Sequence, residues 1–88
     1  MNTQSISIIV PVLNEENNIS LLVKRIAASL ASYEYEIIFV DDHSTDRTKR
    51  TIHHVAKQYP ISLKREMRES TITYRRVFIR GISDSLHD

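Results

Sequence analysis

The sequence of 88 residues has no cysteine, no tryptophan and a single glycine, Gly81. Without cysteine, the chain can form neither disulfides nor cysteine-ligated metal sites. An average composition of about 7% glycine would give about six glycines at this length. The Walker loop and the Gly-x-Gly-x-x-Gly dinucleotide turn both need glycines that let the backbone approach phosphate, so both motifs are excluded.

The chain also lacks long apolar runs and a strong charge of either sign. No apolar run approaches the ~20 residues that span a bilayer, and the N-terminal "MNTQS" has no signal-peptide pattern. The formal net charge of +1 gives no general reason to expect nucleic-acid or membrane binding. We therefore expect one domain at most, located in the cytoplasm or at the cytoplasmic face of the membrane.

Three apolar runs have the pattern of strands. Residues 6–12, "ISIIVPV", and 35–40, "YEIIFV", are apolar on both faces, as strands inside a parallel sheet are. A shorter strand is expected at 61–64. Between these runs, apolar residues recur at helical spacing over about 15–31 and 45–59. This alternation predicts an α/β fold with three parallel strands and flanking helices, the nucleotide-binding half of a Rossmann-like domain.

The helix ends and the tail are predicted from local pattern alone. Asn14 is expected to cap the first helix, and Ser44 or Thr45 the second. The segment "TITYRRVF" has the β-branched and aromatic content of a strand, yet the apolar residues of the tail also fit helical spacing. From this spacing we expect a helix over about 73–86.

Two polar, acidic loops follow the first two predicted strands: "PVLNEE" and "DDHSTD". Ligands of open α/β sheets bind beyond the carboxyl ends of the strands, so these loops are expected to form one rim. Because successive strand residues point to opposite faces, one of Asp41 and Asp42 should reach the ligand while the other braces a neighbouring loop. Carboxylates suit hydrogen bonds to base N–H groups and ribose hydroxyls, or a hard cation. The alternative interpretation is a polar turn with a helix cap.

The two segments "ISIIVPVLNEENNI" and "YEIIFVDDHSTDRT" together resemble the N-terminal part of family 2 glycosyltransferases of the GT-A fold. The resemblance covers about residues 6–65 and is strongest to dolichyl- or polyprenyl-phosphate mannose and glucose synthases. It implies transfer of a hexosyl group from a GDP- or UDP-sugar to a polyprenyl phosphate or a glycan. It also implies which residues line the base and ribose pocket: Pro11, Leu13, Glu15, Val40 and Asp42.

The same resemblance implies supporting roles. Lys64 and Arg65 would be cations on the phosphate side. Asn14, on the first of the two loops, and Asp41, the expected brace, are counted as supporting residues on the strength of their positions alone. Two positions depart from the family pattern: Leu13 replaces a common aromatic residue, and His43 replaces glycine or asparagine. The family's basic, glycine-rich loop lacks its glycines here.

The resemblance further implies a divalent cation, Mg²⁺ or Mn²⁺, held by an Asp-x-Asp motif after a fourth strand. No Asp-x-Asp occurs in these 88 residues. We therefore expect the chain to be about the first third of a catalytic domain, with no catalytic residue and no metal of its own, inactive alone but able to bind nucleotide weakly. We also expect residues 6–12 to present an open strand edge through which the chain forms a homo-oligomer.

Other interpretations remain open at this point. A noncatalytic nucleotide-binding or assembly module derived from the same fold is favoured by the missing motif. A receiver-type phosphoacceptor domain is disfavoured, since receivers carry their acidic pair after the first strand. The basic residues from 64 to 80 suit a solvated face, or contact with a diphosphate or anionic lipid. We expect no nucleic-acid partner, and membrane contact only through parts outside these residues.

Overall fold

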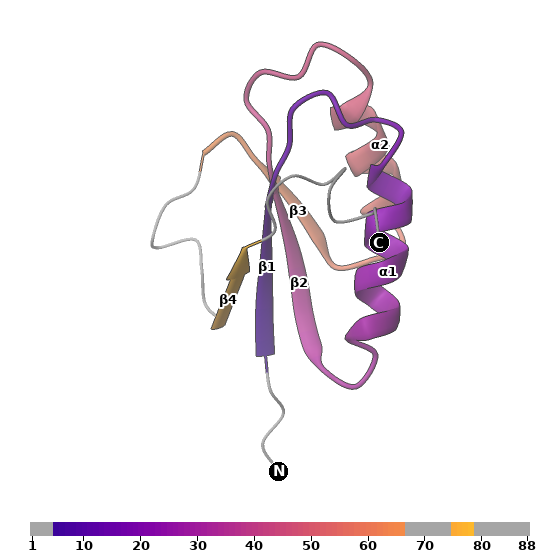
Figure 1. The fold of residues 1–88 in the computed structure, drawn as a ribbon, viewed down its shortest axis with the longest axis vertical. Helices are drawn as coiled ribbons and strands as arrows, with labels where there is room; N and C mark the ends of the chain where they lie inside the picture. Colours follow the sequence, from indigo (N-terminus) through magenta and orange to yellow (C-terminus); the bar gives the residue numbers. More distant parts are fainter. Residues whose placement is uncertain (1–4, 67–74, 79–88) are drawn as a thin grey trace.

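The structure is a computed structural model that describes residues 5–66 and 75–78 of the chain. The described elements, in chain order, are β1 (Ser5–Pro11), α1 (Ile19–Ser29), β2 (Glu34–Val40), α2 (Thr48–Val55), β3 (Ile61–Lys64) and β4 (Arg75–Phe78). Figure 1 shows α1 and α2 together against one face of the sheet. The loops that follow β1 and β2 leave the same end of the sheet, at the top of this view.

The sheet has the strand order β3-β2-β1-β4, and every described pair is parallel. The predicted α/β fold, with three parallel strands and flanking helices, is confirmed. Right-handed crossovers that progress in one direction along a sheet place their helices on the same face, as observed for α1 and α2. The order also matches the first four strands of the doubly wound arrangement, in which ligands bind beyond the carboxyl ends of the strands.

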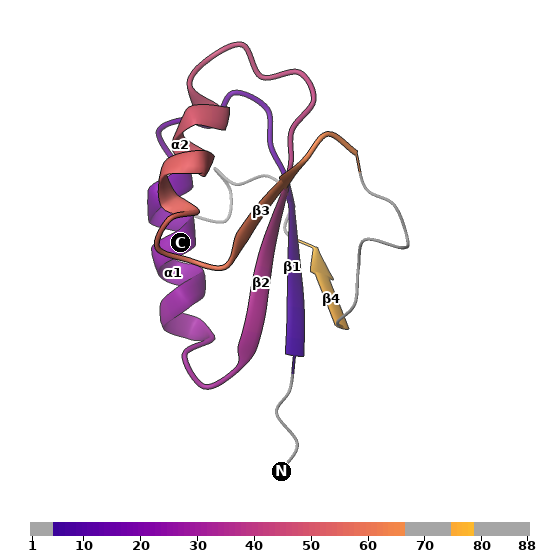
Figure 2. The same cartoon turned by 180° about the vertical axis from the view of Figure 1, so that it is seen from behind.

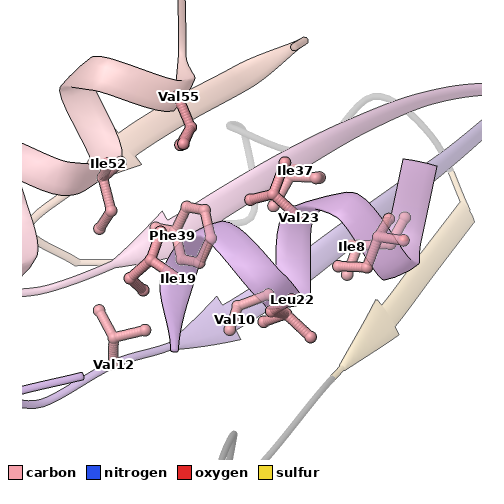
Figure 3. Packing of buried hydrophobic residues seen from close by; sticks show 11 residues of the cluster. Ile8, Val10, Val12, Ile19, Leu22, Val23, Ile37, Phe39, Ile52 and Val55 are labelled. Atoms are coloured by element: carbon pink, nitrogen blue, oxygen red, sulfur yellow. The ribbon is translucent and has the colours of Figure 1, made fainter. Parts of the chain in front are cut away.

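The core lies between the sheet and the two helices (Figure 3). Ile8 and Val10 of β1 belong to this core, and Phe39 of β2 packs there with no exposed surface. On the opposite face of the sheet, Ile9 and Ile38 are also buried. Burial on both faces explains why β1 and β2 are nearly continuous apolar runs instead of alternating ones.

The tail prediction was wrong where the structure describes it. Residues 75–78 form the strand β4 instead of part of a helix, and the rest of the predicted helix 73–86 lies outside the described residues. β4 pairs with β1 from Ile6 opposite Arg75 to Ile9 opposite Phe78. Unpaired backbone groups along a buried strand are costly, so pairing with β1 outweighs the helical spacing of the tail.

This pairing also contradicts the predicted open edge of the first strand. Figure 2 shows β4 alongside β1, on the side of β1 that faces away from β2. Because the backbone of β1 is paired on both sides over residues 6–9, this segment offers no free edge to a second copy of the chain.

Both described helices begin later than predicted. α1 starts at Ile19, after an N-cap at Asn18, and α2 starts at Thr48, after an N-cap at Arg47; neither cap has a side-chain hydrogen bond. The predicted caps Asn14, Ser44 and Thr45 therefore lie in the loops. No helix in the described ranges is long and apolar enough to cross a membrane.

Candidate nucleotide-binding rim

Two loops, residues 12–18 after β1 and 41–47 after β2, form what we call the rim. The last backbone contact between the two strands is the Val12 N–H, which donates to the Val40 carbonyl at 3.0 Å. Beyond this pair the chains separate into the two loops, and side chains make the next contacts between them.

Asn14 makes several of these contacts. Its Oδ1 accepts the backbone N–H of Thr45 at 2.8 Å and that of Asp46 at 3.3 Å, and its own N–H donates to the Ser44 hydroxyl oxygen at 2.9 Å. Its φ of 51° is the only positive value of a non-glycine residue in the described ranges. Asparagine is one of the few non-glycine residues that tolerate this region.

A second group of contacts lies where the loops reach the helices. The buried Thr48 hydroxyl accepts the Glu15 N–H at 2.8 Å and donates to Asp46 Oδ1, while Asp46 Oδ2 accepts the Glu16 N–H at 3.4 Å. Desolvation raises the pKa of Asp46, but hydrogen bonds from the Thr48 hydroxyl and from backbone N–H groups outweigh it and hold this pKa below its usual value.

The two adjacent aspartates have different surroundings. Asp41 is 1% exposed; its N–H donates to the Lys64 carbonyl at 2.9 Å and its Oδ1 accepts the Ser44 N–H at 3.0 Å. Its Oδ2 is buried with no hydrogen-bond partner in the described part of the chain. The Asp42 side chain is 42% exposed, with Oδ1 3.5 Å from Arg65 Nε and Oδ2 3.2 Å from His43 Nε2. Asp41 thus points into the protein and Asp42 towards solvent.

An open cavity of about 260 Å³ lies beside Asp42, and its lining among the described residues is Asp42, Arg65 and Glu66. The structure therefore brings together two of the predicted site residues, Asp42 and Arg65, and adds Glu66, which the sequence interpretation did not include. The other predicted pocket and supporting residues are placed around the rim and at the end of β3: Pro11 and Lys64 are exposed, Leu13 is 60% exposed, and Glu15 and Val40 are half-buried.

Comparison with known proteins identifies the family of this chain. The model of glycosyl transferase family 2 matches residues 7–82. This match includes both rim loops and all four described strands except the first two residues of β1. The chain belongs to glycosyl transferase family 2.

The names of several curated relatives of this family 2 chain combine a prenyl phosphate with a sugar. Over 83 residues it is 34% identical to the dolichol-phosphate mannosyltransferase of Pyrococcus furiosus, covering 94% of this chain and 23% of that protein. It is 49% identical over 45 residues to the dodecaprenyl-phosphate galacturonate synthase of Rhizobium johnstonii, covering 49% of this chain and 13% of that protein. It is 39% identical over 57 residues to the undecaprenyl-phosphate 4-deoxy-4-formamido-L-arabinose transferase of Edwardsiella ictaluri, covering 62% of this chain and 18% of that protein.

The 88 residues thus span less than a quarter of the length of these relatives. A divalent cation is implied for the family, but the described residues of this chain do not fit one. Among the described residues, two carboxylates line the cavity, those of Asp42 and Glu66, and Asp42 faces Arg65, while Asp41 is buried against Ser44. Nowhere in the described ranges do three or more potential ligands of the His, Cys, Asp and Glu types gather closely enough to hold a metal.

Proposed function

We propose that this chain supplies the nucleotide-binding part of a family 2 glycosyltransferase that transfers a hexosyl group from a GDP- or UDP-sugar. The observation that carries the proposal is the Asp42 carboxylate. This carboxylate is exposed at the carboxyl end of β2, beside a cavity. Hydrogen bonds within the protein hold the rim on which it lies in place. An ionised carboxylate only accepts hydrogen bonds, so it suits the N–H groups of a base or the hydroxyls of a ribose.

Two groups of other kinds lie on the neighbouring rim loop and at the cavity. Leu13, on the neighbouring loop, exposes apolar surface on which the face of a base can pack. Arg65, which lines the cavity, carries a guanidinium group suited to phosphate oxygens. An acceptor, an apolar surface and a cation together match the three parts of a nucleoside diphosphate.

We infer that a bound nucleotide takes the place of Arg65, one of the two present partners of Asp42, while His43 lies 3.2 Å from the other carboxylate oxygen. The Arg65 and Asp42 side chains are both exposed, at 86% and 42%, and Arg65 Nε lies 3.5 Å from Asp42 Oδ1. Ion pairs exposed to water contribute about 0–1 kcal/mol. Opening this pair therefore costs little, and the released Arg65 becomes available to the diphosphate.

The acceptor class is proposed from the relatives. The names of three of them contain a prenyl phosphate: dolichol, dodecaprenyl or undecaprenyl phosphate. We propose that the complete enzyme uses a polyprenyl phosphate or a glycan acceptor, at the cytoplasmic face of the membrane, with Mg²⁺ or Mn²⁺ bound by residues outside this chain.

Titration calorimetry with GDP and UDP tests the binding proposal. We expect the 88-residue chain to bind at least one of them at about millimolar concentration, a binding free energy of about −4 kcal/mol. Asp42→Ala should weaken that binding about tenfold, the equivalent of one hydrogen bond to a charged group. Glu34→Ala is the matched control, because Glu34 is an exposed acid at the opposite end of β2. No binding by the unsubstituted chain, or equal effects of the two substitutions, would contradict the proposal.

A noncatalytic nucleotide-binding or assembly module is the second candidate, favoured by the absence of any Asp-x-Asp in the 88 residues. Both candidates predict that the purified 88-residue chain transfers no sugar from a GDP- or UDP-sugar to a polyprenyl phosphate. Product detected in that assay would refute this shared expectation. Sequencing the gene beyond codon 88 separates the candidates, since an in-frame Asp-x-Asp soon after it supports the enzyme.

A further inference from the structure

We propose that Asn14 is a positioning residue for nucleotide binding: its side chain sets the separation between the loop that carries Leu13 and the loop that carries Asp42. This inference rests on the proposed function, because it concerns the geometry of the same site. Asn14 itself is not proposed to contact the nucleotide.

Leu13 and Asp42 both lie between two connections that join the loops. The first is the backbone hydrogen bond from Val12 to Val40, at 3.0 Å. The second is the set of contacts that Asn14 makes with residues 44–46. Two chain segments joined at both ends can change their separation little, so a base packed on Leu13 meets the Asp42 carboxylate at a fixed distance.

A short path of hydrogen bonds connects Asn14 to the residue before Asp42. The backbone N–H of Asn14, which every substitution at this position keeps, donates to the Ser44 hydroxyl oxygen at 2.9 Å, and the Ser44 N–H donates to Asp41 Oδ1 at 3.0 Å. Asp41 is buried, and its backbone is held to Lys64. The path therefore links the first loop to a rigid position at the start of the second loop.

Residue 14 must satisfy two requirements at once. Its backbone has a positive φ of 51°, and its side chain must accept N–H groups from Thr45 and Asp46. Glycine meets only the first requirement, alanine meets neither, and aspartate meets both. Three substitutions at one position can thus separate backbone shape from side-chain contact.

The experiment compares Asn14→Gly, Asn14→Asp and Asn14→Ala in the 88-residue chain. Ser5→Ala is the control, because it removes one exposed side-chain hydrogen bond, to Glu34, at the opposite end of the sheet. Circular dichroism establishes that each variant is folded. Calorimetry gives the Kd of GDP or UDP, and NMR gives the hydrogen-exchange rates of the Thr45 and Asp46 amides.

Asn14→Gly should keep the fold but raise the nucleotide Kd about tenfold, because the loops adopt the binding-competent separation for a smaller fraction of the time. It should also speed exchange of the Thr45 and Asp46 amides, which lose their acceptor. In the Asn14→Asp variant, the nucleotide Kd and the two exchange rates should both lie within about threefold of those of the unsubstituted chain. Ser5→Ala should change neither. The Asn14→Ala variant should bind nucleotide more weakly than the Asn14→Gly variant, or should not fold, because alanine disfavours positive φ.

An unchanged Kd in Asn14→Gly, or a failure of Asn14→Asp to restore binding, would overturn the positioning role while leaving the proposed function intact. Absence of nucleotide binding by the unsubstituted chain would overturn the proposed function, and with it this role. Exchange rates that Asn14→Gly leaves unchanged would show that the side chain does not hold the second loop, and would overturn the role whatever the Kd.

Discussion

Thr48 is the buried residue through which the start of α2 holds the first rim loop, and replacing it with valine tests what this contact contributes to stability. Valine keeps the branched shape and nearly the volume of threonine but lacks the hydroxyl. The substitution therefore removes the acceptor of the Glu15 N–H, 2.8 Å away, and the donor to Asp46. Thr48 has no exposed surface, so water cannot replace its hydroxyl without rearrangement of the loop.

A buried backbone N–H that is left without an acceptor lowers the free energy of unfolding by about 1–3 kcal/mol. Glu15 is half-buried, so we expect the lower part of this range, about 1–2 kcal/mol. A chain of 88 residues has a total stability of about 4–13 kcal/mol, at about 0.05–0.15 kcal/mol per residue. Thr48→Val should therefore remove a substantial fraction of the stability and lower the Tm by about 4–16 °C.

Urea unfolding followed by far-UV circular dichroism measures this loss, with the m value compared between variants. Thr51→Val is the matched control: it lies on the same helix and removes only a bond from its hydroxyl to the Arg47 carbonyl. We expect it to change the free energy of unfolding by less than about 0.5 kcal/mol. If Thr48→Val and Thr51→Val cost the same, the buried hydroxyl does not hold the loops and the reasoning fails.

Two further predictions concern pH and the core. Desolvation raises the pKa of Asp46, but hydrogen bonds from Thr48 and Glu16 lower it by more. The net effect is a pKa below the usual 3.8. The folded state thus binds fewer protons than the unfolded state, and this contribution to stability, complete above about pH 4, is lost as the pH falls through the folded pKa. The urea midpoint should then fall more between pH 6 and pH 3 for the unsubstituted chain than for Asp46→Asn, and equal falls would contradict this. Phe39→Ala should cost about 3–5 kcal/mol and Phe39→Leu about 1.5 kcal/mol or less by the same unfolding assay; a loss below about 1 kcal/mol for Phe39→Ala would refute its place in the core.

The parts of the fold that were predictable are those encoded by neighbouring residues. The run "EIIFV" identifies β2 because both faces of a strand inside a parallel sheet are buried, so apolar residues follow one another. β4 was not predictable in this way. Its local pattern fits two periodicities, and the choice is made by pairing with β1, whose residues are distant in the sequence.

The same distinction applies to the rim. Opposite orientations of Asp41 and Asp42 follow from strand geometry and were predicted. The helix starts were not, because Asn14, Ser44 and Thr45 look like caps in the sequence but bond to the opposite loop instead. Thr48 and Glu66 were missed for a related reason: nothing local distinguishes a threonine that reaches another loop from one on a helix surface, or a glutamate that lines a cavity from a solvated one.

The position of β4 separates the folding of the rim from completion of the sheet. Consecutive crossovers connect β1 to β3, so these elements pair with near neighbours in the chain. The register of Ile6 opposite Arg75 closes a loop that contains all of them, and closing long loops is entropically costly and slows folding. The hydrogen bonds between the two rim loops all lie between residues 12 and 48. We therefore expect the contacts between the rim loops to form before β4 pairs with β1.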